Sequence, residues 1–206
     1  MMKILDLLSN HDYIGFGSGE SLKKIIEELA IHSKNSLPVL LIASKDLSMF
    51  AKSLGFYVQS WRSAQDIPLM IDQIDWATHQ RTISFGKDNC ILEKNILRLI
   101  ALKVFNIVEK ENFIKGYTKE KCYIEVIPEA SSIVARELLK KGYRASFIDS
   151  YSIRGNWVME FQSDEIDIFW ENLIEISKIP GVLGHGVLTD SKQSLLIKDE
   201  DEYSVY

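Results

Sequence analysis

The chain has 206 residues, 46% of them hydrophobic and 26% charged, which is enough to bury a sizeable core in one large domain or in a large and a small one. The formal net charge of -5 and the mixing of acidic with basic residues argue against a nucleic-acid-binding surface. No apolar run reaches the roughly 18 residues of a membrane span, and the N-terminus lacks the apolar core of a signal peptide. We therefore expect a soluble, cytoplasmic protein, in which Cys90 and Cys122 are isolated thiols.

Strand and helix patterns alternate along the first half of the chain. Apolar runs at 13–17 and 39–44 predict buried strands, and the helical spacing of apolar residues from Leu22 to Leu29 predicts a helix between them. The pattern continues with a helix over 45–55, strands over 56–60 and 68–72, and a helix that runs into a strand over 95–109. Repeated strand–helix units indicate an α/β fold, with a Rossmann-like, mostly parallel sheet and helices on both faces.

From Cys122 onward the order of predicted elements is strand, helix, strand, strand, helix, strand, which is the split βαβ pattern of a small α+β domain. These elements cover 122–128, 129–142, 144–151, 156–161, 165–179 and 181–188. We therefore predict an α/β domain over residues 1–121 and an α+β domain over 122–190. The apolar run 194–198 makes residues 191–206 a candidate to return to the first sheet.

A glycine-rich segment, GFGSGES at 15–21, follows the first apolar run and opens onto the first predicted helix. Such a turn presents free backbone N–H groups to anions, so it is a candidate phosphate-binding loop. Glu20 works against phosphate, because a carboxylate favours the first turn of a helix and repels phosphate at close range. If Glu20 points to solvent instead, the N–H groups stay free. The candidate phosphate-binding residues are Gly17, Ser18, Gly19, Glu20 and Ser21.

Several motifs, in chain order, resemble those of type A ribose 5-phosphate isomerases. The glycine-rich loop looks like that family's G-x-G-T-G-S-T. The later matching segments are KSLGFYV, YIEVIPEASSIVAREL, RGN and IPGVLGHGVL. The resemblance covers nearly the whole chain, and the conserved order and spacing of the motifs make it specific. It implies an α/β large domain and a ferredoxin-like small domain, in a homodimer or homotetramer.

The resemblance implies an aldose–ketose isomerisation of ribose 5-phosphate to ribulose 5-phosphate. In the family a carboxylate general base moves a proton between C1 and C2, lysines and acids polarise the oxygens, and the loop holds the phosphate. No metal or other cofactor is implied, and the four histidines show no metal-ligand spacing such as H-E-x-x-H. The expected partner is a small sugar phosphate of the pentose phosphate pathway. We expect no binding to nucleic acid or to a membrane.

Two of the family's acids are kept. Its D-G-A-D-E motif reads DQIDW in this chain, which retains Asp72 and Asp75 and puts Trp76 in place of the glutamate. The resemblance makes both aspartates candidates for contacts with sugar hydroxyls. An aspartate that ends a strand also commonly caps the following turn. If Trp76 fills the family's pocket, the cleft is smaller and less polar.

The family's lysines are replaced. Its K-G-G-G motif reads FGKD here, with Phe85 at the lysine position and Lys87 two residues later. The lysine of its A-D-x-S-K motif falls on Asn112. The chain therefore lacks both ammonium groups at the positions from which the family polarises the substrate oxygens.

The general base is replaced as well. The family's T-R-E-K motif reads LEKN, so Lys94 stands at the base position and Glu93 precedes it. Neighbouring residues of a helix point about 100° apart, so Glu93 takes over only if the helix shifts by one residue. Without a base we expect a rate loss on the order of 10²–10⁴-fold.

Three hypotheses stay open. The chain is a divergent isomerase that uses Asp72 and Asp75 together with a relocated Glu93 or Lys87; it is a non-catalytic sugar-phosphate-binding or interaction protein; or it acts on another substrate. A carboxylate facing the two aspartates would favour the first hypothesis. Closure of the pocket by Phe85 and Trp76 would weigh against it.

Overall fold

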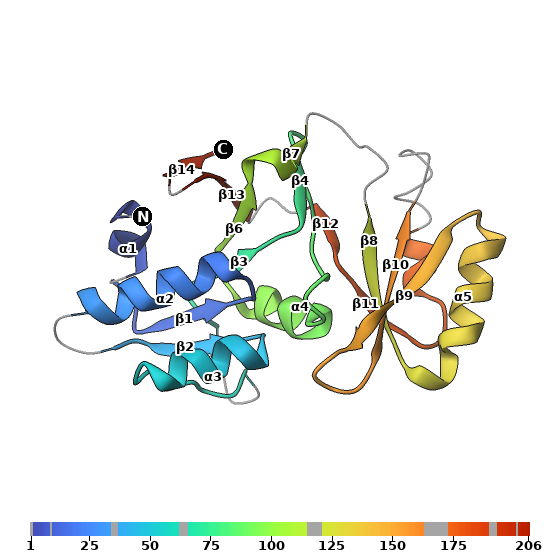
Figure 1. Ribbon diagram of the computed structural model, residues 1–206, viewed down its shortest axis with the longest axis horizontal. Coiled ribbons are helices and arrows are strands. Elements are labelled where there is room, and N and C mark those ends of the chain that lie inside the picture. The colour runs from blue at the N-terminus through green and yellow to red at the C-terminus, as the bar shows by residue number, and fades with distance from the viewer. Residues whose placement is uncertain are drawn as a thin grey trace. The chain divides into compact units, whose positions relative to one another are not determined.

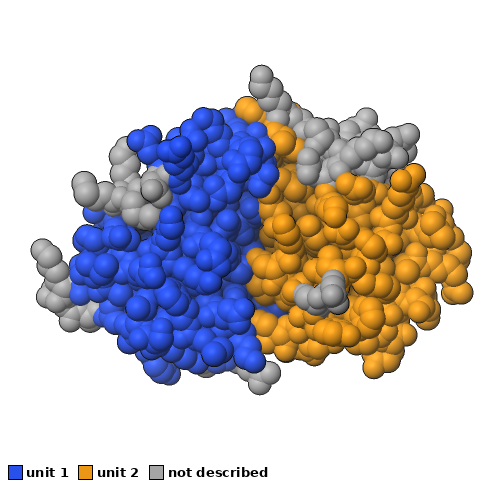
Figure 2. All heavy atoms as spheres, in the orientation of Figure 1, with its two compact units in different colours: residues 1–74, 93–113, 190–206 blue, residues 75–92, 114–189 orange. Residues whose placement is uncertain are grey.

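The computed structural model of the chain describes residues 2–8, 10–33, 37–61, 66–114, 121–162, 173–189, 193–200 and 202–206 (Figure 1). The chain folds into two compact units, coloured separately in Figure 2. Unit 1 comprises Met1–Ile74, Glu93–Phe113 and Asp190–Tyr206, and unit 2 comprises Asp75–Leu92 and Ile114–Thr189.

Unit 1 is built on a six-stranded sheet with the strand order β14-β13-β6-β3-β1-β2. Neighbouring strands are parallel except for β14, which pairs antiparallel with β13. The strands are β1 Tyr13–Phe16, β2 Val39–Ile42, β3 Leu69–Gln73, β6 Val104–Glu109, β13 Gln193–Asp199 and β14 Glu202–Val205. The C-terminal segment thus returns to the first sheet, because β13 lies beside β6.

Helices cover both faces of this sheet. They are α1 Met2–Leu8, α2 Glu20–His32, α3 Lys45–Ser53 and α4 Ile91–Ile100. In Figure 1, α2 and α3 lie along β1 and β2, and buried side chains such as Leu22 and Leu47 join α1–α3 to Ile14 and Phe16 in one core. Successive side chains of a strand point to opposite faces of the sheet. Those of Asp72 on β3 and Asn106 on β6 point to the other face, where residues 93–100 of α4 lie. The predicted α/β fold is confirmed.

The predicted strand over 56–60 is reduced to one parallel bridge between Leu40 and Val58. The backbone of Leu40 donates to Tyr57 and accepts from Gln59, at 3.0 and 2.9 Å. Phe56 is buried in the core of unit 1, whereas Tyr57 is 68% exposed.

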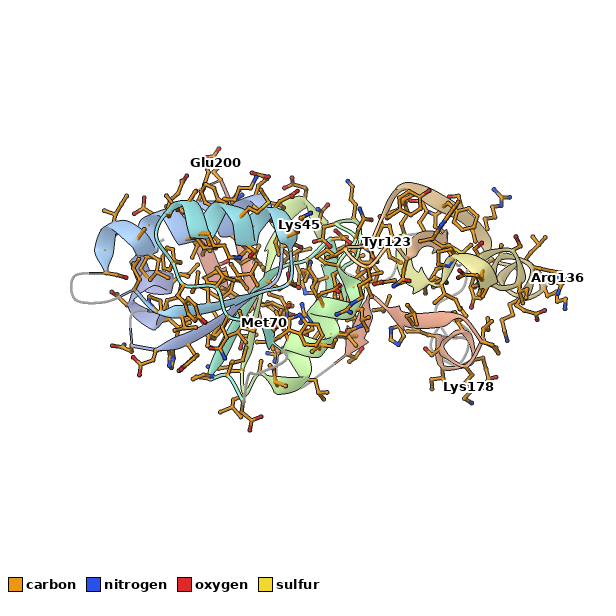
Figure 3. All side chains as sticks on the ribbon, turned by 90° about the horizontal axis from the view of Figure 1, so that it is seen from below. Lys45, Met70, Tyr123, Arg136, Lys178 and Glu200 are labelled. Carbon is orange, nitrogen blue, oxygen red and sulfur yellow. The ribbon has the colours of Figure 1, made fainter. Side chains whose placement is uncertain are left out.

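Unit 2 contains an antiparallel sheet with the order β11-β8-β10-β9. Its elements are β8 Cys122–Val126, η3 Pro128–Ala130, α5 Ser131–Lys140, β9 Arg144–Tyr151, β10 Trp157–Gln162 and β11 Val182–His185. A core that includes Ile124, Val134 and Phe161 packs α5 on one face, and the exposed side chains of Arg136 and Lys178 point outward (Figure 3). Most of the helix predicted over 165–179 lies outside the described residues; 173–177 are helical.

Residues 75–92 join unit 2 rather than the large domain in which the sequence placed them. They contribute to a second sheet with the order β12-β5-β4-β7, formed by β4 Trp76–Thr78, β5 Thr82–Ser84, β7 Phe113–Ile114 and β12 Val187–Thr189. The physical reason is Trp76, which is 4% exposed in the core of unit 2 and donates its indole N–H to the Lys121 carbonyl at 2.9 Å. Within the described parts of the chain, no helix is long and apolar enough to cross a bilayer.

Stability should depend on the protonation of His185. Its Nδ1 accepts the Val187 N–H at 3.4 Å, and burial lowers the pKa of the imidazole below 6.5. The unfolded chain therefore binds this proton more readily, so the stability is complete above the unfolded pKa and is lost as pH falls toward the lower folded value. Thermal melts at neutral pH and about pH 5 should show a smaller acid-induced loss for His185→Asn than for the natural chain. Equal losses would contradict this role.

Candidate functional site

Asp72 lies near the carboxyl end of β3, on the face that α4 covers, and is fully buried. Lys94 Nζ lies 3.0 Å from Oδ1 of this carboxylate, and Arg98 Nη2 lies 2.6 Å from Oδ2. Lys94 and Arg98 are four residues apart on α4, so both reach the same place. Each oxygen of Asp72 therefore has its own cation.

The network continues into the sheet. Arg98 Nη2 also donates to Asn106 Oδ1 at 2.7 Å, and Asn106 Nδ2 donates to Gln193 Oε1 at 2.8 Å. Lys94 donates in addition to the Gln73 carbonyl at 3.2 Å. Buried charges need such partners because desolvation is costly. The network ties α4 to β3, β6 and β13.

The glycine-rich loop between β1 and α2 wraps the same carboxylate. The Ser18 backbone N–H donates to Asp72 Oδ1 at 3.2 Å. A Cβ atom at Gly17 would overlap the Asp72 carboxylate, so only glycine fits there. The loop and the aspartate are thus in direct contact in unit 1.

Gln73 makes a second contact with this loop. Its Oε1 accepts the Ser21 N–H, in the first turn of α2, at 3.0 Å. Gly19 has a φ of 130°, and a Cβ atom there would overlap the Gln73 side chain. Sequence analysis did not predict a role for this residue. The signal was that Gln73 replaces the glycine of the family's D-G-A-D-E motif.

Glu20 points to solvent, which is the second of the two arrangements that the sequence allowed. Its side chain is 83% exposed and Oε1 lies 2.7 Å from Lys23 Nζ. The Ser21 hydroxyl instead lies 3.5 Å from Glu109 Oε1, which also accepts a hydrogen bond from Lys198 Nζ at 2.7 Å.

Glu93 lies beside Lys94 on α4 and is 3% exposed. Lys94, and not Glu93, faces Asp72. The one-residue helix shift that would exchange them is therefore absent from this part of the described chain. Asn112, at the family's later lysine, is an exposed residue of η2 Lys110–Asn112.

The remaining candidates belong to unit 2. Asp75 Oδ2 accepts the backbone N–H of Lys87 at 3.2 Å, and the Lys87 residue itself is exposed. Phe85 is fully buried, and its N–H donates to the Gly186 carbonyl at 2.7 Å. Phe85 and Trp76 are thus both buried within unit 2.

Glu125 is a buried acid that the sequence analysis did not single out. Its Oε2 accepts the Leu92 N–H at 3.2 Å, and its Oε1 accepts from Asn156 Nδ2 at 2.8 Å. These contacts connect the YIEVIP segment to the RGN turn and to the N-terminal end of α4. The carboxylate is used for hydrogen bonds within unit 2.

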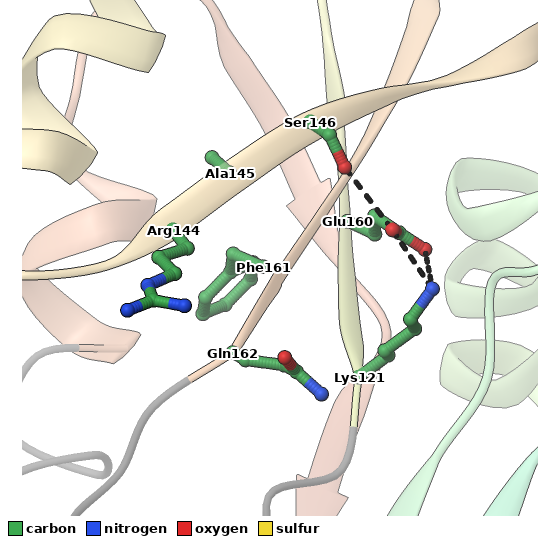
Figure 4. Close-up of a pocket in the computed structure, with 7 residues that line it drawn as sticks. All are labelled: Lys121, Arg144, Ala145, Ser146, Glu160, Phe161 and Gln162. Atoms are coloured by element: carbon green, nitrogen blue, oxygen red, sulfur yellow. Dashed lines mark hydrogen bonds and ion pairs between the residues drawn. The ribbon is translucent and has the colours of Figure 1, made fainter.

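A pocket on the surface of unit 2 offers a further candidate (Figure 4). Lys121 Nζ lies 2.9 Å from both oxygens of Glu160, and the Ser146 hydroxyl donates to Oε1 at 3.1 Å. This carboxylate is already satisfied, so the pocket presents no reactive acid. Its lining residues are Lys121, Arg144, Ala145, Ser146, Glu160, Phe161 and Gln162. The described residues contain no cluster of histidine, cysteine and acidic side chains that could hold a metal.

Unit 1 is an open α/β protein whose candidate site lies at the carboxyl ends of its strands. The family model of ribose 5-phosphate isomerase A (phosphoriboisomerase A) matches residues 39–202. The chain belongs to the ribose 5-phosphate isomerase A family, which confirms the resemblance read from its motifs.

Known proteins agree with this assignment. The ribose-5-phosphate isomerase A of Legionella pneumophila (strain Lens) is 27% identical over 178 residues, which cover 84% of this chain and 81% of that protein. The solved ribose 5-phosphate isomerase A of Neisseria gonorrhoeae has a TM-score of 0.85 at 24% identity, covering 94% of this chain and 87% of that one. A D-ribose-5-phosphate isomerase solved with phospho-erythronic acid has a TM-score of 0.86 at 20% identity, covering 94% and 90%.

Breaking the buried ion pairs by removing the carboxylate should be strongly destabilising. Asp72→Asn leaves two buried cations without their counter-charge, so we expect a loss of about 3–5 kcal/mol in the free energy of unfolding. Lys94→Met leaves Asp72 paired with Arg98 and should cost less. Denaturant unfolding at neutral pH measures both changes.

The matched control is Asp199→Asn, which breaks an exposed ion pair with Lys110 and should change the unfolding midpoint little. An Asp72→Asn variant no less stable than this control would show that the buried network does not hold unit 1 together.

Proposed function

We propose that this chain is a ribose 5-phosphate isomerase family member in which the aldose–ketose isomerisation of ribose 5-phosphate is impaired. The proposal rests on one observation. Lys94 stands at the family's base position and forms a buried ion pair with Asp72. Proton abstraction next to a carbonyl needs a placed base that can accept the proton. An ammonium group held by a carboxylate cannot accept it.

The surroundings of Asp72 support the same proposal. Oδ1 already accepts from Lys94 and from the Ser18 N–H, and Oδ2 accepts from Arg98. These three donors use most of the roughly four acceptor positions of a carboxylate, so few are left for sugar hydroxyls. The aspartate therefore has less capacity to position a substrate than its retention in the sequence suggests.

The developing enediolate also lacks its expected stabilisers. Phe85 and Asn112 replace the family's lysines, and the Phe85 side chain is buried. Positioned charges are commonly the largest contribution to stabilising such a transition state. The solved complex with phospho-erythronic acid supports a phosphorylated sugar as the ligand class of the family site, and we propose that class for any binding this chain retains.

Conversion of ribose 5-phosphate to ribulose 5-phosphate at high protein concentration tests the proposal. We expect a rate at least about 10²-fold below that of the Legionella pneumophila relative in the same buffer, because the base is absent. Asp75→Asn, Glu93→Gln and Lys94→Met are assayed in parallel.

A rate close to that of the relative, lost in Asp75→Asn or Glu93→Gln, would mean that the chain has rebuilt a catalytic site and would overturn the proposal. A rate that none of the three substitutions changes belongs to a contaminating isomerase.

A further inference from the structure

We propose that Gln73 is a specificity-determining residue, whose carboxamide acts as an internal ligand of the glycine-rich loop and excludes phosphate from it. This inference rests on the proposed function, because it concerns the ligand of the same site. It does not depend on whether isomerisation is lost.

The contact is made with the group that would otherwise face an anion. Ser21 lies in the first turn of α2, where backbone N–H groups have no partner within the helix. Such groups are the usual donors to a phosphate. In this chain the Ser21 N–H donates to Gln73 Oε1 at 3.0 Å.

The loop backbone is shaped around this side chain. A Cβ atom at Gly19 would overlap both the carboxamide oxygen and the Cβ of Gln73. The Gln73 side chain therefore fills the space beside the glycine, and a phosphate group entering the loop would have to displace it.

A second loop donor is also in use. The Ser18 N–H donates to Asp72 Oδ1, and Asp72 is fixed by Lys94 and Arg98. Displacing Gln73 would thus free one donor and leave a carboxylate at the other. The neutral carboxamide is the movable part of the occupied loop.

The charges around Ser21 are already paired, and a neutral occupant keeps them balanced. Glu109 Oε1 lies 3.5 Å from the Ser21 hydroxyl and is balanced by Lys198. Glu20 points away and pairs with Lys23. A carboxamide oxygen adds no charge beside Glu109, whereas a phosphate would add up to two negative charges.

Calorimetric titration with ribose 5-phosphate tests the inference. Gln73→Gly should bind at least about tenfold more tightly than the natural chain, because a freed N–H donates to a charged oxygen. Gln73→Ala should gain less, since its Cβ still lies against Gly19. Gln73→Glu keeps an oxygen at Ser21, adds a charge and should gain nothing.

The matched control is Gln80→Gly, because Gln80 is an exposed glutamine in a turn of unit 2. It should leave the affinity unchanged. Melting curves without ligand establish that each variant is folded. If Gln73→Gly does not fold, the affinity of Gln73→Ala decides the test.

The inference is overturned if neither Gln73→Gly nor Gln73→Ala gains affinity, whether the natural chain binds tightly or not at all. A natural chain that turns ribose 5-phosphate over would defeat the proposed loss of catalysis and leave this comparison of affinities intact. Equal affinities without turnover would defeat the inference alone.

Discussion

The ion pairs of the buried Asp72 carboxylate with Lys94 and Arg98 are the interaction around which the candidate site of unit 1 is built. A charge at this depth is stable only with close partners, and here they come from α4 and from the loop after β1. One side chain of β3 therefore joins the central sheet to the helix on one face and to the turn at its edge. Lys94, Arg98 and Ser18 each place a donor on this one group.

That arrangement changes what the site can do. The three side chains of Asp72, Lys94 and Arg98 carry a net charge of +1, whereas a glutamate at position 94 would make it -1. A general base needs negative charge that is free to accept a proton, and the lysine removes it. The lysine instead supplies a cation to Oδ1 of the aspartate, beside Arg98 at Oδ2. Stability and proton transfer thus make opposite demands on the same few atoms.

Continuous apolar runs separated by helical patterns were enough to predict the parallel sheet, because strands that are buried on both faces are apolar throughout. The three-residue strands β4 and β5 were too short to show a period, and the pairing of β5 with β12 joins residues about a hundred positions apart. Motif matching found Gly17 and Asp72, and the role of Gln73 could have been read from its replacement of a glycine. The role of Arg98 could not be predicted from the sequence, because an arginine four residues after a lysine looks like the polar face of a helix. Its burial is explained only by its contacts with Asp72 and Asn106.

Two of the departures from the family pattern, Lys94 and Gln73, act on one loop and are therefore coupled. Lys94 and Arg98 hold Asp72 against the Ser18 N–H, and the adjacent Gln73 occupies the Ser21 N–H. A glutamate at position 94 would place a second carboxylate beside Asp72, with Arg98 left to balance both, and so would loosen the hold on Ser18 while Gln73 still occupied Ser21. Residues that share partners in this way do not contribute additively. The affinity gained by removing Gln73 and any proton transfer recovered by a base at position 94 should therefore not be additive, because both changes act on groups around Asp72.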